Sequence, residues 1–190
     1  MSQLTKAAII NAFIKTLKDK PFEKITINDI TDECGISRMT FYYHFEDIYD
    51  MVDYAIKGKL EKAISGDFSY ETWHQDCTAV LEAILKEKAF FVKIFSVIDL
   101  RRVELYLSDF ARKYVLEIID EQSVRYGIVL NKDSREMVCG IYSYSVIGVL
   151  LNWIATGMKE EPSVLSNRFV SITKGTLKVI LANAAENNNT

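Results

Sequence analysis

Apolar residues in the first 20 positions recur at spacings of three and four, the period of an amphipathic helix. We therefore expect a helix over residues 5–18, ended by Pro21, whose ring cannot continue it. Its buried face would carry the apolar residues Ala8, Ile9, Ala12, Phe13 and Leu17.

Two shorter helices follow. Thr26 with Asp29 three positions later forms a variant of the capping box and predicts a helix over residues 27–34. Gly35 is typical of the turn after a helix, and Ser37 is a good cap for a next helix from Arg38 to Phe45. Two short helices joined by a tight turn containing glycine indicate a helix-turn-helix.

The rest of the chain is also predicted to be helical. A fourth helix is expected over residues 47–64, and further helices at about 70–87, 88–97, 100–126, 134–157 and 163–184. The 190 residues include only 8 glycines and 2 prolines, which favours long helices over a strand-and-turn fold. We predict an all-α protein with a three-helix head at residues 1–50 and a larger helical domain at 51–190, the boundary falling inside the fourth helix.

The third helix has more aromatic residues than one buried face needs. On a helical wheel, Phe41 and Phe45 define the buried side, while Met39 and Tyr43 point nearly the opposite way. Thr40 and Tyr42 flank the outward residues, and His44 lies at the edge. The outward face is thus almost uncharged and rich in hydroxyl groups. The plainer alternative is that Tyr42 or Tyr43 packs on the fourth helix.

These residue types suit the major groove of DNA. Arg38 can bind a guanine with two hydrogen bonds, and Met39 and Thr40 can contact a thymine methyl group. Hydroxyl, imidazole and helix N-terminal amide groups are suited to phosphates. The candidate phosphate contacts are Thr26, Ser37, Tyr42, Tyr43 and His44.

The segment FEKITINDITDECGISRMTFYYHFEDIYDMVDYAI, residues 22–56, resembles the DNA-binding head of the TetR family of bacterial transcriptional regulators. A fainter likeness is to the branch that includes regulators of dihydroxyacetone kinase. The resemblance implies a cytoplasmic, ligand-responsive homodimer that binds a pseudo-palindromic operator in double-stranded DNA, with an unidentified small-molecule effector. The residues that match the family pattern in order are Thr26, Ile30, Cys34, Gly35, Ser37, Thr40, Tyr42, Tyr43, His44 and Phe45.

The sequence departs from this family at the start of the fourth helix. The family usually has a lysine there that meets a phosphate, whereas this chain has Ile48, with Glu46, Asp47 and Asp50 around it. Acidic residues suit a helix N-terminus but repel DNA. Each phosphate contact that is missing flattens the salt dependence of binding by about one unit of slope.

In the family, the larger domain binds the effector and forms the dimer. Aromatic residues with polar tips are typical of a ligand pocket, although an aromatic-rich core is the plainer interpretation. The candidate pocket residues are Trp73, His74, Tyr106, Phe110, Tyr114 and Tyr142. The candidate dimer interface, on the last two predicted helices, consists of Val149, Leu150, Trp153, Ile154, Phe169, Ile172 and Leu177.

Composition and charge limit the classes of function that the chain can have. The net charge is −3, and residues 1–45 have six basic and five acidic side chains, so non-specific attraction to DNA should be modest. Three separated cysteines and two histidines form no recognisable metal or catalytic motif, so we expect neither an enzyme nor a metal site nor a cofactor. Residues 137–158 are uncharged and long enough to cross a membrane, but their polar residues favour a buried helix.

One rival function stays open. The alternative is an all-helical protein-interaction module that retains the head but binds DNA weakly or not at all. The acidic start of the fourth helix and the nearly neutral head both favour it.

Overall fold

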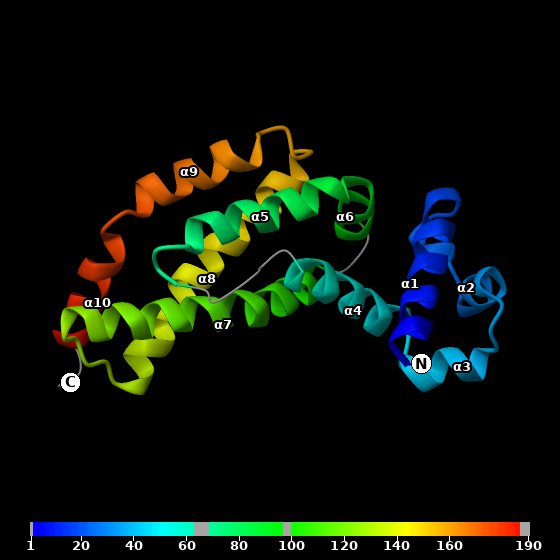
Figure 1. The fold of residues 1–190 in the computed structure, drawn as a ribbon, viewed down its shortest axis with the longest axis horizontal. Helices are drawn as coiled ribbons and strands as arrows, with labels where there is room; N and C mark the ends of the chain where they lie inside the picture. Colours follow the sequence, from blue (N-terminus) through cyan, green and yellow to red (C-terminus); the bar gives the residue numbers. More distant parts are fainter. Residues whose placement is uncertain (1, 63–68, 97–99, 187–190) are drawn as a thin grey trace.

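The computed structural model describes residues 2–62, 69–96 and 100–186, and every regular element in these ranges is helical (Figure 1). The all-α prediction is therefore confirmed. In chain order the elements are α1 (Ser2–Asp19), the 3-10 helix η1 (Phe22–Lys24), α2 (Ile27–Cys34), α3 (Arg38–His44), α4 (Ile48–Glu61), α5 (Trp73–Lys86), α6 (Lys88–Phe95), α7 (Leu100–Tyr126), α8 (Lys132–Ala155), α9 (Pro162–Thr173) and α10 (Thr176–Glu186).

In the head, the helices begin and end at the capping and turn residues that the sequence predicts. The Thr26 hydroxyl accepts the Asp29 backbone N–H at 3.3 Å, and the Asp29 carboxylate accepts the Thr26 backbone N–H at 2.7 Å, which completes the capping box of α2. Gly35 ends α2 with a φ of 68°, a left-handed conformation that suits glycine. Ser37 then accepts the Thr40 backbone N–H at 3.1 Å and begins α3.

The end of the chain differs from the prediction of one helix over residues 163–184. The structure has two helices, α9 and α10, separated at Lys174 and Gly175. Gly175 has a φ of 79°, and Lys174 has an extended ψ of 120°, so the backbone leaves the helical region at both positions. The apolar spacing continues on both sides, which is why periodicity alone did not reveal the break.

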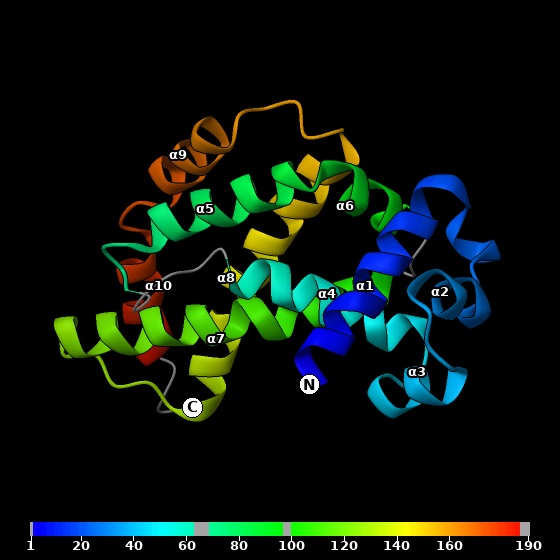
Figure 2. The ribbon, with the colours of Figure 1, turned by 45° about the vertical axis from the view of Figure 1, so that its right-hand side comes forward.

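Helices α4–α10 form a larger body beside the head (Figure 1). In the body α7 packs against α8, α5 packs against α9, and α10 packs against both α7 and α8. Helix α4 connects the two parts, since it contacts α1 at the head and α5 in the body. Figure 2 shows α3 at the lower edge of the head, at one end of the molecule.

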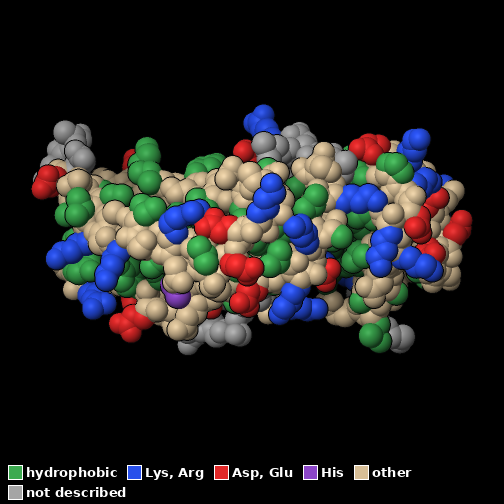
Figure 3. Space-filling model, turned by 90° about the horizontal axis from the view of Figure 1, so that it is seen from above, with side chains coloured by type: hydrophobic (Ala, Val, Ile, Leu, Met, Phe, Trp, Pro, Cys, Tyr) green, Lys and Arg blue, Asp and Glu red, His purple; other side chains and the backbone are tan. Residues whose placement is uncertain are grey.

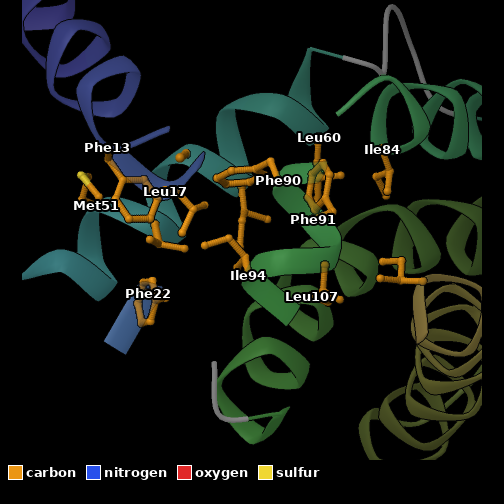
Figure 4. Packing of buried hydrophobic residues seen from close by; sticks show 14 of the residues in the cluster. Phe13, Leu17, Phe22, Met51, Leu60, Ile84, Phe90, Phe91, Ile94 and Leu107 are labelled. Carbon is orange, nitrogen blue, oxygen red and sulfur yellow. The ribbon is translucent and has the colours of Figure 1, made fainter. Parts of the chain in front are cut away.

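Head and body share one continuous hydrophobic core. The cluster begins with Phe13 and Leu17 of α1 and continues through Phe90 and Phe91 of α6. It then reaches Leu60 at the end of α4 and Leu107 of α7, as the row of labelled side chains in Figure 4 shows. The head and the body are therefore packed against each other through side chains rather than joined by the chain alone.

Polar contacts also join α6 to its surroundings. Lys93 donates its ammonium group to the carbonyl of Leu17 in the last turn of α1. At the start of α6, Glu87 forms an ion pair with Lys59 of α4 at 2.9 Å. Helix α6 is thus tied to both helices through which the head meets the body.

Helix α8 carries the long uncharged segment. By length and composition it can cross a membrane, but seven of its side chains are buried in the core and it packs against α6, α7 and α10. Only 39% of its most apolar window is buried, so the helix also keeps an uncharged face exposed.

Candidate DNA interface and internal cavity

Helix α3 presents the outward face predicted from the helical wheel. Phe41 is fully buried and Phe45 nearly so. By contrast, 83% of Tyr43, 79% of Met39 and 47% of Tyr42 are exposed. Large hydrophobic side chains exposed together on one short helix are costly in water unless a partner covers them. The alternative that Tyr43 is packed against α4 is excluded by its exposure.

The remaining side chains of α3 are held in place around these residues. The Arg38 guanidinium lies 6.0 Å from the centre of the Tyr42 ring and donates to its hydroxyl oxygen at 3.4 Å. The Thr40 and Ser37 hydroxyls are 3.0 Å apart, and the ring of His44 meets that of Tyr43 edge to face at 5.0 Å. Six of the predicted DNA-contacting residues therefore lie in three neighbouring pairs on and just before α3.

Thr26 is exposed, but its polar groups already have a partner. Its hydroxyl donates to the Asp29 carboxylate at 2.7 Å, and Lys20 donates to the same carboxylate at 2.7 Å. The hydrogen bonds from Lys20 and Thr26 lower the pKa of Asp29 to about 2. A phosphate at this position must replace Asp29 as the acceptor of the Thr26 hydroxyl.

The acidic start of α4 has a structural explanation. Asp47 caps the helix by accepting the Asp50 backbone N–H at 2.8 Å, and Asp50 accepts the Glu46 backbone N–H at 3.0 Å. Ile48 is half-buried and packs against the hydrophobic core. These residues form and anchor the helix, and Ile48 cannot take the place of the lysine that the family usually has there.

The charges of the head partly neutralise each other. Lys15 pairs with Glu33 at 2.5 Å, a contact that raises the pKa of Lys15, and Lys20 pairs with Asp29. On the face seen in Figure 3, basic and acidic side chains are interspersed over both parts of the molecule. The field at the head is therefore weak, and recognition of DNA would depend on contacts at short range.

A cavity of about 400 Å³ lies inside the body, among α4, α5, α7, α8, α9 and α10. Five of the six candidate pocket residues line it, namely Trp73, His74, Phe110, Tyr114 and Tyr142. The sixth, Tyr106, has a side chain outside the described part of the structure. The cavity volume is in the range of about 300–1,000 Å³ typical of small-molecule sites.

Polar side chains around the cavity are paired with neighbours. His74 Nε2 lies 2.7 Å from the side-chain oxygen of Asn167, and the Tyr142 hydroxyl lies 2.8 Å from that of Thr176. Burial raises the pKa of Tyr114 and of Tyr142. Burial also raises the pKa of Cys77 to about 12, so its sulfur is a neutral thiol at pH 7.

The candidate dimer residues lie in three different places. Trp153 and Ile154 are buried in the core of the chain, and the Trp153 indole donates to the carbonyl of Glu160 at 2.8 Å. Ile172 is 71% exposed. The other four line the cavity, namely Val149, Leu150, Phe169 and Leu177. Leu150 and Leu177, like Trp153 and Ile154, are buried in their own chain and offer little surface to a second copy. Val149 and Phe169 are half-buried, so with Ile172 they remain predicted interface residues.

Sequence reasoning missed other residues of the cavity. Leu60, near the end of α4, lines it, and so do Cys77 and Val80 of α5 and Val146 of α8. No pattern within one helix shows which buried residue borders a space between several helices. Among the described residues, no three histidine, cysteine or acidic side chains lie close enough to hold a metal ion.

Fold and site together define a helix-turn-helix regulator with a hollow helical body. Residues 9–55 match the family model described as bacterial regulatory proteins, tetR family, and residues 71–175 match the model of a transcriptional regulator C-terminal region. The chain belongs to the TetR family of bacterial transcriptional regulators, which are DNA-binding proteins and not enzymes.

Two relatives are similar along nearly the whole chain. One is the HTH-type dhaKLM operon transcriptional activator DhaS of Lactococcus lactis subsp. lactis (strain IL1403), 23% identical over 178 residues that cover 94% of this chain and 93% of that protein. The other is a solved structure, the dihydroxyacetone kinase operon activator DhaS, with a TM-score of 0.70 and 17% identity. The match covers 92% of this chain and 97% of the chain in that structure, and it supports the fold alone.

Proposed function

We propose that this regulator binds a pseudo-palindromic operator as a homodimer, with one α3 in the major groove at each half-site, and that a small molecule in the cavity controls its affinity for DNA. The observation that carries this proposal is the exposed face of α3, where Met39, Tyr42 and Tyr43 are open to solvent beside Arg38. The protein would act in the bacterial cytoplasm, where its operator lies.

Each residue of α3 has a role in the proposed complex. Arg38 would turn from Tyr42 to bind a guanine, while Met39 and Thr40 contact thymine methyl groups. The hydroxyls of Tyr42 and Tyr43 would donate to phosphates. The remaining phosphate contacts would come from His44, Ser37 and Thr26.

The proposed dimer uses the exposed face of α8. This face has no charged side chain between Met137 and Ala155, and Met137, Ile141 and Tyr144 are all exposed on it. Gly148 lies on the same face, where a second helix can approach closely. A two-fold axis here would place the two heads on the two half-sites of one operator.

The switch would act through α4. Leu60 lines the cavity at one end of this helix, while Met51 and Val52 pack in the head core at the other. A molecule that fills the cavity pushes on Leu60, and the rigid helix carries that displacement to the head. Affinity for DNA then changes by the difference between the effector's affinities for the two arrangements.

Selection of bound sequences from a random pool of duplex DNA tests the proposal. We expect a palindrome whose half-sites are about one helical turn apart or more. A chain that enriches no sequence after several rounds, at a salt concentration low enough to favour binding, would contradict operator recognition. An enriched site without two-fold symmetry would contradict the dimer.

A second function is favoured by one observation. The paired charges of the head and the carboxylates at the start of α4 weaken attraction to phosphates, which suits an interaction module that does not bind DNA. Asp47 and Asp50 are used as caps, however, and caps are needed whatever the head binds. We therefore favour the operator-binding function, and the same selection experiment distinguishes the two.

A further inference from the structure

The walls of the cavity are chemically uniform. Most of the lining comes from aliphatic and aromatic side chains on six helices, including Leu81, Leu107, Val115, Val146 and Val170. Such a surface gains free energy by covering apolar area, at about 25 cal/mol for each Å² removed from water. The gain is available only to a molecule that is itself largely apolar.

Hydroxyl groups on the lining are used within the protein. The Ser166 hydroxyl lies 2.6 Å from that of Thr78, and the Thr78 hydroxyl also donates to the His74 carbonyl at 2.9 Å. The Thr173 hydroxyl donates to the Phe169 carbonyl at 2.9 Å. A ligand with many hydroxyls would lose its hydrogen bonds to water and regain few, which costs about 1–3 kcal/mol for each group left without a partner.

Of the three charged side chains on the cavity lining, Glu71 and Lys174 are exposed and Asp76 is half-buried. The Glu71 carboxylate lies 3.8 Å from Arg125. In the interior, Cys77 remains a neutral thiol, as the burial that raises its pKa requires. The half-buried carboxylate of Asp76 also lines the cavity and would repel an organic anion, while the basic side chain of Lys174 is exposed. Removing an anion from water into this cavity is therefore unfavourable.

We infer that the cavity holds an uncharged, largely apolar molecule with an aromatic or long aliphatic body, and neither a small polyol nor an organic anion. The size agrees, because a small polyol such as glycerol would fill only a fraction of about 400 Å³ and leave apolar walls uncovered. This inference rests on the proposed function in one respect, that the cavity is the effector site.

The test uses two fluorescent dyes with the same ring system and the full-length protein. N-phenyl-naphthylamine is neutral, whereas anilinonaphthalene sulfonate is an anion. We expect the neutral dye to bind with an affinity at least about tenfold higher, a factor equivalent to about 1.4 kcal/mol. Glycerol in large excess should not displace it. Equal or tighter binding of the sulfonate, or displacement by glycerol, would overturn the inference.

Two matched substitutions locate the bound dye. Val146→Phe adds the volume of a ring inside the cavity and should reduce affinity for the neutral dye by about tenfold or more, since it occupies the binding space. Val124→Phe adds the same volume at an exposed position of α7 and should leave the affinity unchanged. Val80→Phe, on another wall of the cavity, replaces the first variant if circular dichroism shows that it does not fold. Undiminished binding to a folded cavity variant would place the dye elsewhere and overturn the inference.

A separate measurement keeps this inference distinct from the proposed function. The affinity for a selected DNA site is measured with and without a saturating concentration of the neutral dye. A DNA affinity that does not respond to the dye in the cavity would contradict the effector role of that cavity. Selective binding of the neutral dye in the same cavity would still support the chemical class of its ligand.

Discussion

Arg38 is the residue of α3 from which base recognition is expected. Its guanidinium lies against Tyr42 and has no acidic partner among the described residues to give up on binding DNA. We predict that Arg38→Ala lowers affinity for the selected operator by about 1–3 kcal/mol and relaxes specificity at one base pair of each half-site. Fluorescence anisotropy with labelled operator duplexes measures both effects.

The matched control is Arg125→Ala, which removes an arginine at the other end of the molecule. It should bind the operator like the unaltered protein. Equal affinities for all three proteins would show that Arg38 does not contact a base.

The lowered pKa of Asp29 predicts that the stability of the protein depends on pH through this one residue. Its pKa is lowered in the folded protein to about 2, from an ordinary value of 3.8, by hydrogen bonds from Lys20 and Thr26. A group with a lowered folded pKa stabilises the protein above its unfolded pKa and loses that effect as the pH falls toward the folded value. Asp29→Ala should therefore lower the free energy of unfolding at pH 7, and the difference should shrink between pH 4 and pH 2.

Urea denaturation at several pH values measures this difference. Asp32→Ala, on the exposed side of the same helix, is the control, because Asp32 is not part of the capping box. A gap between Asp29→Ala and the unaltered protein that stays constant down to pH 2 would contradict the prediction.

At the scale of elements, a hydrogen bond from α6 to α1 adds to the hydrophobic contacts between the body and the head. Lys93 donates to the carbonyl of Leu17 at the C-terminal end of α1, where a positive charge also favours the helix dipole. We predict that Lys93→Met lowers the free energy of unfolding by about 1–2 kcal/mol and weakens the response of DNA affinity to a bound ligand.

Denaturation and anisotropy with the neutral dye measure the two effects. Lys159→Met removes a lysine from an exposed loop between α8 and α9 and should change neither quantity. If Lys93→Met is less stable but responds fully to the ligand, the contact stabilises the fold without transmitting the switch.

The elements also show why sequence reasoning succeeded in one region and not in another. In the head, Thr26, Gly35 and Ser37 fix helix ends by local interactions, and the contrast between Phe41 and Tyr43 shows which side is buried. Helix α8 carries no charged side chain between Met137 and Ala155, so the pattern of residues does not show which of its sides is buried. Leu150 and Trp153, which were predicted for the dimer interface, are both buried within the chain.

At the scale of the whole molecule, the exposed face of α8 is the side of this helix that does not pack into the core. Gly148 is the position on this face at which the dimer is best tested. A Cβ added there meets nothing within 4 Å, apart from the neighbouring backbone of its own helix. The single chain can thus accept a larger side chain, whereas a second α8 packed against this face cannot. The Gly148→Glu substitution therefore tests whether two copies associate without disturbing the fold of the single chain.

We predict that Gly148→Glu retains its helical circular dichroism and sediments as a monomer, while the unaltered protein sediments as a dimer. The buried carboxylate would be opposed by its symmetric copy across the two-fold axis, so the interface would lose more than the packing of one residue. Gly58→Glu makes the same change in α4, where added atoms also meet open space, and should stay dimeric. A dimeric Gly148→Glu would place the interface elsewhere. A monomer should still recognise one half-site weakly and lose its preference for the palindrome, because each α3 then binds alone.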